Sequence, residues 1–133
     1  MKRVNESVVA VFVVGAFIAA IWSIIIYQNV YNSVIEFFPP QFRDPLTSRY
    51  AFPILALSRS TPLLLQADYV KSLSGFCVLF LCISLSFFSI QQLIIGCLFL
   101  GVFFVAVFST IKSWKTYKAN CNRSVARSDN EER

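Results

Sequence analysis

The stretch "SLSGFCVLFLCISLSFFSIQQLIIGCLFLGVFFVAVFSTI", residues 72–111, decides the fold because it contains no charged residue. As one straight helix it would be about 60 Å long, whereas the hydrocarbon core of a bilayer is about 30 Å thick. The chain therefore has to turn back within this stretch. Its most polar point is Ser89 to Gln92, so the sequence predicts a two-span helical hairpin with spans at residues 73–89 and 93–111.

A second charge-free run lies between Glu6 and Glu36. It is long enough for a span of about 20 apolar residues, which we place at residues 7–29. A cleaved signal peptide beginning with Lys2 and Arg3 is the alternative, but the apolar run is too long and no small-residue cleavage site closes it. Because only 14% of the residues are charged, against about a quarter in a soluble domain, we expect an all-α integral membrane protein with three transmembrane helices.

Residues 30–72 connect the first span to the hairpin and are rich in proline and aromatic residues. Since proline interrupts helices, we expect an interfacial loop here. The prolines in question are Pro39, Pro40, Pro45 and Pro53. The run from Ser60 to Pro62 is a helix-start signal, which predicts an amphipathic helix leading from about residue 62 into the second span.

The two ends of the chain differ in charge. Residues 1–6 form a short N-terminal end, and residues 112–133 form a basic tail that we expect to be disordered after Tyr117, because its composition cannot bury a core. Of the 12 lysines and arginines, only Lys2 and Arg3 precede the first span. The positive-inside rule therefore predicts an extracytoplasmic N-terminus, with the loop and the tail cytoplasmic. We expect the membrane to be the inner (plasma) membrane of a bacterium.

The loop carries more apolar surface than a water-exposed linker would. Aromatic residues that sink into the bilayer interface, beside arginines that meet lipid phosphates, would explain this composition. A surface for a partner protein is the other interpretation, and the two are compatible. The residues assigned to this candidate surface are Phe37, Phe38, Phe42, Arg43, Asp44, Arg49, Tyr50, Phe52 and Arg59.

Two further sets of residues suggest roles in the membrane. Small residues let helix backbones approach closely, either within one chain or in a homo-oligomer. The candidates for such packing are Gly15, Ala19, Gly96 and Gly101. Lysines and aromatic rings that follow a span are typical headgroup anchors. The candidates here are Lys112, Trp114, Lys115, Tyr117 and Lys118.

The residue types needed for catalysis or metal binding are scarce. The chain has no histidine, and the spacing of its four cysteines matches no metal or redox motif. No Asp, Glu, Lys, Arg or His lies inside the predicted spans, where a proton or ion pathway normally needs one of them. We therefore assign no catalytic, cofactor or metal-binding residue, and we expect no nucleic-acid partner because membrane topology explains the basic charge.

The layout, with "DPL" at residues 44–46 opening a loop between membrane helices, resembles the universal stress protein B family of small bacterial membrane proteins. A three-span chain with a basic tail is also similar in outline to phage holins, although the long loop departs from their compact form. The leading hypothesis is a non-catalytic accessory or regulatory subunit that acts by helix packing and its interfacial loop. The alternatives are a holin-like pore-forming oligomer and, third, a membrane-bound enzyme.

Overall fold

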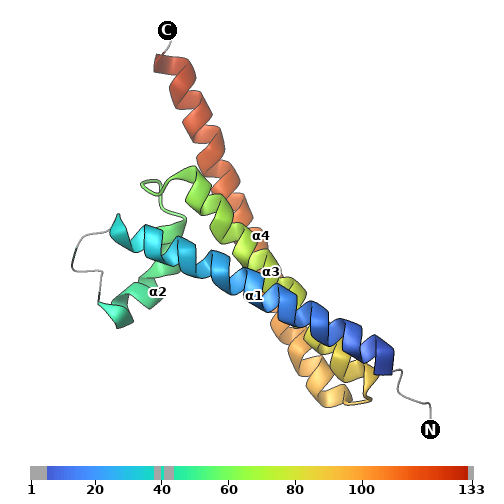
Figure 1. Ribbon diagram of the computed structural model, residues 1–133. Helices are drawn as coiled ribbons and strands as arrows, with labels where there is room; N and C mark the ends of the chain where they lie inside the picture. Colours follow the sequence, from blue (N-terminus) through green and yellow to red (C-terminus); the bar gives the residue numbers. More distant parts are fainter. Residues whose placement is uncertain (1–5, 38–39, 41–43, 132–133) are drawn as a thin grey trace.

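The computed structural model describes residues 6–37, 40 and 44–131, and the side chains of Pro45 and residues 128–131 are outside that description. Within this part of the chain the regular elements are four α-helices (Figure 1). They are α1 (Glu6–Glu36), α2 (Pro45–Ala56), α3 (Leu63–Ser89) and α4 (Leu93–Glu131). Three of them, α1, α3 and α4, are long and apolar enough to cross a membrane. The predicted all-helical class with three such helices is therefore confirmed.

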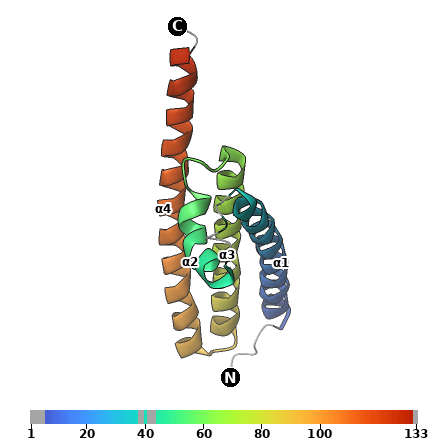
Figure 2. The same ribbon diagram turned by 90° about the vertical axis from the view of Figure 1, so that its left-hand side faces the viewer.

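The helix α3 is the central element. Both α1 and α4 pack along α3, on different sides of it, and α2 packs mainly against α1 (Figures 1 and 2). The long helices thus form an open layer, and many large apolar side chains point outward. Such exposure suits lipid, which solvates apolar side chains as well as a protein interior does. Examples are Val11, Phe17, Ile94, Phe104 and Phe108.

The helices α1 and α3 approach each other closely at Gly75. A Cβ atom at this position would overlap the hydroxyl oxygen of Ser23 and would lie 3.1 Å from the ring of Trp22. Ser23 is fully buried, and its hydroxyl donates to the carbonyl oxygen of Ala19 at 2.6 Å, one turn earlier in α1. The missing side chain of Gly75 therefore lets the two helix backbones approach closely, in the manner of small residues in membrane helices.

Residues 90–92 connect α3, which ends at Ser89, to α4, which begins at Leu93. Gln91 has a φ angle of 62°, in the left-handed region that allows the chain to reverse within so few residues. The hydroxyl of Ser84 donates across the hairpin to the carbonyl oxygen of Gly96 at 2.9 Å. One polar bond and close packing beside the turn thus fix the register of the two helices.

The helices extend further than the sequence indicates. The tail, expected to be disordered after Tyr117, continues α4 as far as Glu131. The chain contains no glycine or proline after Gly101, so nothing interrupts the helix once the span has nucleated it. Likewise α1 runs past residue 29 to Glu36, and the loop contains the three-turn helix α2. The expectation of an irregular loop and a disordered tail is corrected accordingly.

Candidate interfacial surface

The helix α2 begins at a capping residue. The backbone N–H and the hydroxyl of Thr47 both donate to the carboxylate oxygen Oδ2 of Asp44, each at 3.4 Å. Pro45 occupies the first turn, where its missing N–H costs nothing. Asp44 and Pro45 together are a standard helix start, and this start separates α2 from the preceding segment.

One face of α2 is buried. Ser48, Phe52 and Ala56 lie four residues apart, on the same side of the helix, and all three are buried. The ring of Phe52 is 1% exposed and makes edge contacts with Tyr27, Tyr31 and Tyr69, at centroid distances of 5.0, 5.1 and 5.5 Å. Phe52 therefore belongs to the core, and its assignment to the candidate surface is corrected. The reason is that a helix, unlike a loop, turns this position inward.

The extension of α1 provides the other half of this core. Val30 and Val34 are buried against α2, beyond the predicted end of the first span. The hydroxyl of Tyr31 lies 2.7 Å from that of Ser48, at hydrogen-bonding distance. These contacts fix α2 on the long helices, so that its other face is presented in a constant orientation.

The outward face of α2 is a stripe of large apolar residues. Leu46, Tyr50 and Ile54 again lie four residues apart, and they are 70%, 84% and 76% exposed. We refer to these three residues as the α2 stripe. Arg49 lies beside it and is exposed. Sequence reasoning overlooked the regular spacing of Leu46 and Ile54 with Tyr50, because prolines at 45 and 53 indicated a loop.

The other residues of the predicted surface are scattered. Phe37 is 64% exposed at the end of α1, and Asp44 and Arg59 are exposed on either side of α2. Phe38, Phe42 and Arg43 lie outside the described residues. The structure thus brings together Arg49 and Tyr50 on one outward face and places the remainder around it.

A hydrogen-bonded network joins the loop after α2 to the tail helix. The side-chain amide of Gln66 donates to the carbonyl oxygens of Ser58 and Thr61, at 3.0 and 2.8 Å. The amide of Asn120 donates to the oxygen Oε1 of Gln66 at 2.9 Å and to the carbonyl oxygen of Leu57 at 3.2 Å. Sequence reasoning missed this network, because uncharged amides so far apart in the chain give no signal of contact.

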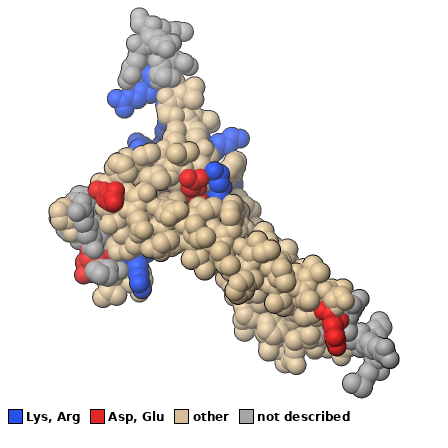
Figure 3. All heavy atoms as spheres, in the orientation of Figure 1, with Lys and Arg blue, Asp and Glu red and all other residues tan. Residues whose placement is uncertain are grey.

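Figure 3 shows the described lysines and arginines on the half of the molecule that holds α2 and the tail part of α4, where acidic side chains also lie, and none at the opposite end of this face. At the α2 end, Lys71 and Lys115 line the same apolar hollow of about 330 Å³ between α3 and α4. Lys71 also forms an exposed ion pair with Asp68, at 2.8 Å. The two lysines therefore lie at one level on neighbouring helices, as headgroup anchors would.

The other predicted anchors lie on the same part of α4. Lys112 and Lys118 are exposed, Trp114 is half exposed, and the Trp114 ring lies 5.7 Å from that of Tyr117. This arrangement of lysines and rings matches an aromatic and basic belt just beyond a span.

The four predicted packing residues have different surroundings. A Cβ atom at Gly96 would lie 2.9 Å from the ring of Phe88, which makes Gly96 a tight position inside the hairpin. At Gly15 it would make only an ordinary contact with the sulfur of Cys82, at 3.7 Å, and at Gly101 it would meet nothing within 4 Å. Ala19 accepts the Ser23 hydrogen bond. Gly75, where an added Cβ atom would meet the nearest neighbour of the four glycines, was not among the predicted residues.

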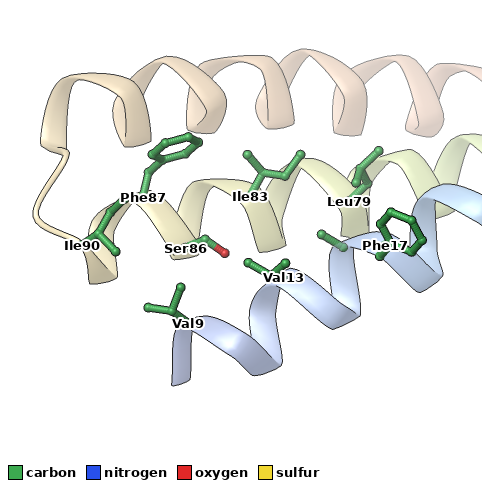
Figure 4. A pocket seen from close by; sticks show the side chains of 9 residues that line it. Val9, Val13, Phe17, Leu79, Ile83, Ser86, Phe87 and Ile90 are labelled. Carbon is green, nitrogen blue, oxygen red and sulfur yellow. The ribbon is translucent and has the colours of Figure 1, made fainter. Parts of the chain in front are cut away.

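An apolar groove of about 390 Å³ lies between α1 and α3, near the hairpin (Figure 4). Aliphatic and aromatic side chains line it, including Val13, Phe17 and Ile83. The polar side chain among them, Ser86, donates its hydroxyl to the backbone oxygen of Cys82 at 2.8 Å. The groove thus offers space for an acyl chain or a helix side chain, and its described lining contains no ionisable group.

Metal binding has no support in the described ranges, since no three residues among their Cys, Asp and Glu side chains are grouped to hold an ion. Chemically, the arrangement can bury apolar surface at α2 and can bind anions through its basic residues. No known protein family, curated protein or solved structure matches this chain.

Proposed function

We propose that this protein is a non-catalytic accessory or regulatory subunit, which binds another membrane protein through the α2 stripe. The observation that carries this proposal is the pair of opposite faces on α2. Ser48, Phe52 and Ala56 fix the helix from within, while the α2 stripe remains uncovered. Helices with an apolar stripe beside charged residues often bind in a groove of a partner protein. A helix that is already fixed loses little conformational entropy when it binds.

We further propose that the protein lies in a bacterial inner membrane with its N-terminus outside and with α2 and the tail in the cytoplasm. The gathering of basic residues at the α2 end supports this orientation (Figure 3). A reporter enzyme that is active only in the cytoplasm, fused after residue 133, is expected to be active. Activity solely of a periplasmic reporter at the same position would reverse the orientation.

When no partner is bound, the α2 stripe would contact the bilayer interface. Tyr50 and Leu46 can sink among the headgroups while Arg49 meets phosphate. A partner protein would therefore displace lipid from the α2 stripe, and not water. Binding therefore depends on shape and hydrogen bonds as well as on apolar area, and it calls for a test that separates lipid from protein.

A pore-forming oligomer would need a polar face along its spans. Several described hydroxyls within the spans already donate to carbonyl oxygens of this chain, as Ser84, Ser86 and Thr110 show. This use of the polar groups favours a packing role over a channel. Holin-like assembly is therefore the second candidate, and the same experiment tests it.

The experiment is photo-crosslinking in cells that express the chain at its natural level. A photoreactive phenylalanine analogue replaces Leu46, Tyr50 or Ile54, and the matched control positions are Phe104 and Phe108 on the exposed side of α4. We expect one discrete adduct with another membrane protein from the α2 positions and lipid adducts from the α4 positions. Lipid adducts alone at every position would contradict the partner proposal. A ladder of self-adducts from α4, with loss of membrane potential, would favour the pore.

A further inference from the structure

A cavity of about 220 Å³ lies between the loop that follows α2 and the tail part of α4. Three arginines, Arg59, Arg123 and Arg127, are among its described lining residues, and no carboxylate is among them. Arg59 comes from the loop, whereas Arg123 and Arg127 lie one turn apart on α4. Two separate segments therefore bring positive charge to one small hollow.

Uncharged residues that are hydrogen-bonded to one another, including Gln66, Thr61 and Asn120, line the cavity beside the arginines. Gln66 is 1% exposed, and both its amide and its oxygen take part in the hydrogen bonds that join Ser58, Thr61 and Asn120. Thr61 is also buried, with its hydroxyl donating to the carbonyl oxygen of Leu55 at 2.7 Å. No buried polar side-chain atom in the described residues lacks a hydrogen-bond partner, and the network joins the loop to α4. It therefore holds together the two segments that carry the exposed side chains of Arg59 and Arg123.

Two of the cavity's arginines have no carboxylate partner among the described residues. The ion pair in that part of the chain joins Lys71 to Asp68, and neither Arg59 nor Arg123 takes part in one. Bringing like charges together costs Coulomb energy, which a bound anion would reverse. Leu63, in the first turn of α3, lines the same cavity, so the positive end of this helix adds to the field.

We propose that this cavity binds a phosphate group, held by the guanidinium groups of Arg59 and Arg123. Guanidinium donates two parallel hydrogen bonds to phosphate oxygens, and arginine is the side chain best suited to such recognition. The volume lies below the roughly 300 Å³ of small-molecule sites, which suits a phosphate group rather than a whole nucleotide.

The distance of the cavity from the bilayer indicates which phosphate compounds can reach it. Arg123 lies about 18 Å beyond Ile111 along α4, at 1.5 Å per residue, and Ile111 ends the apolar part of the helix. The headgroup layer adds only about 5 to 7 Å to each side of the hydrocarbon core. With α4 upright, the cavity thus lies about 11 to 13 Å beyond the headgroup layer. A soluble phosphate compound reaches it there directly, whereas a lipid phosphate reaches it only if the tail part of α4 tilts toward the bilayer.

The test uses the full chain in lipid nanodiscs. In nanodiscs of phosphatidylcholine, pyrophosphate is titrated at constant ionic strength and followed by calorimetry. In mixed nanodiscs, the enrichment of phosphatidylglycerol around the protein is measured by native mass spectrometry. The cavity variant combines Arg59→Gln with Arg123→Gln. The matched control combines Lys2→Gln with Arg3→Gln, which removes the same charge and involves neither a described lining residue of the cavity nor a candidate headgroup anchor.

Saturable pyrophosphate binding that weakens at least tenfold in the cavity variant, but not in the control, supports the proposal with a soluble ligand. Lipid enrichment with the same dependence supports it with a headgroup as the source. A second variant, Arg59→Lys with Arg123→Lys, keeps the charge and is expected to recover part of the binding, which guards against misfolding. The proposal is overturned if neither probe binds, or if both glutamine variants lose binding equally. This outcome is independent of whether the α2 stripe binds a partner.

Discussion

At the scale of single residues, the absence of a side chain matters as much as its presence. A Cβ atom added at Gly75 would overlap Ser23 of α1, whereas one added at Gly101 would meet no other atom within 4 Å. The sequence identifies both as glycines in apolar helices, and spacing alone cannot tell them apart. The difference depends on which face of α3 meets α1, which only the packed structure determines.

We expect Gly75→Ala to destabilise the protein by about 1 to 3 kcal/mol, because the new methyl group overlaps the Ser23 hydroxyl and crowds the Trp22 ring. Unfolding in mixed micelles is the measurement, and Gly101→Ala is the matched control with no expected loss. Removing the Ser23 hydroxyl in the double variant Ser23→Ala with Gly75→Ala should recover part of the stability. Equal stability of the Gly75→Ala and Gly101→Ala variants would show that α1 and α3 are less tightly packed at Gly75 than described.

At the scale of the element, the three long apolar helices follow from the two charge-free runs, because an apolar run that crosses a bilayer as a single segment is helical. The helix α2 could not be predicted from the sequence, since its prolines are typical of a loop. They are tolerated because Pro45 is in the first turn and Pro53 lies near the end of the helix. The tail is helical where disorder was predicted, because the prediction considered the polarity of the tail and not its lack of glycine and proline.

The two faces of α2 predict opposite outcomes for two aromatic substitutions. Phe52→Ala leaves a cavity among Tyr27, Tyr31 and Tyr69 and should cost about 3 to 5 kcal/mol of stability. Tyr50→Ala removes an exposed ring and should change stability by no more than about 0.5 kcal/mol. Both are measured by chemical unfolding in mixed micelles. A larger loss for Tyr50→Ala would mean that α2 is rotated from its described orientation.

At the scale of the whole molecule, the network of Gln66 and Asn120 connects the loop after α2 to the tail helix, so both the α2 region and the arginine cavity depend on it. These residues are 54 positions apart in the chain. No local pattern in the sequence indicates their contact, and the cavity was equally unforeseen. What the sequence does indicate is the shared basic character of the loop and the tail.

We expect Asn120→Ala to leave the buried Gln66 oxygen without its donor, at a cost of about 1 to 3 kcal/mol. Faster amide hydrogen exchange in the α2–α3 loop and in the end of α4 is the readout. Asn122→Ala, at an exposed position on the same helix, is the control and should leave exchange unchanged. Equal exchange in both variants would indicate that the tail is held by other contacts.

The most direct test of the central claim, that α2 is a fixed helix with opposite faces, is a spin-label scan of residues 46–56 in nanodiscs. Collisions with oxygen report lipid exposure, and collisions with a water-soluble nickel chelate report water exposure. At Leu46, Tyr50 and Ile54 we predict a high collision rate with either oxygen or the nickel chelate. At Ser48, Phe52 and Ala56 we predict low collision rates with both reagents. Uniform rates along the segment, without a helical period, would contradict the claim.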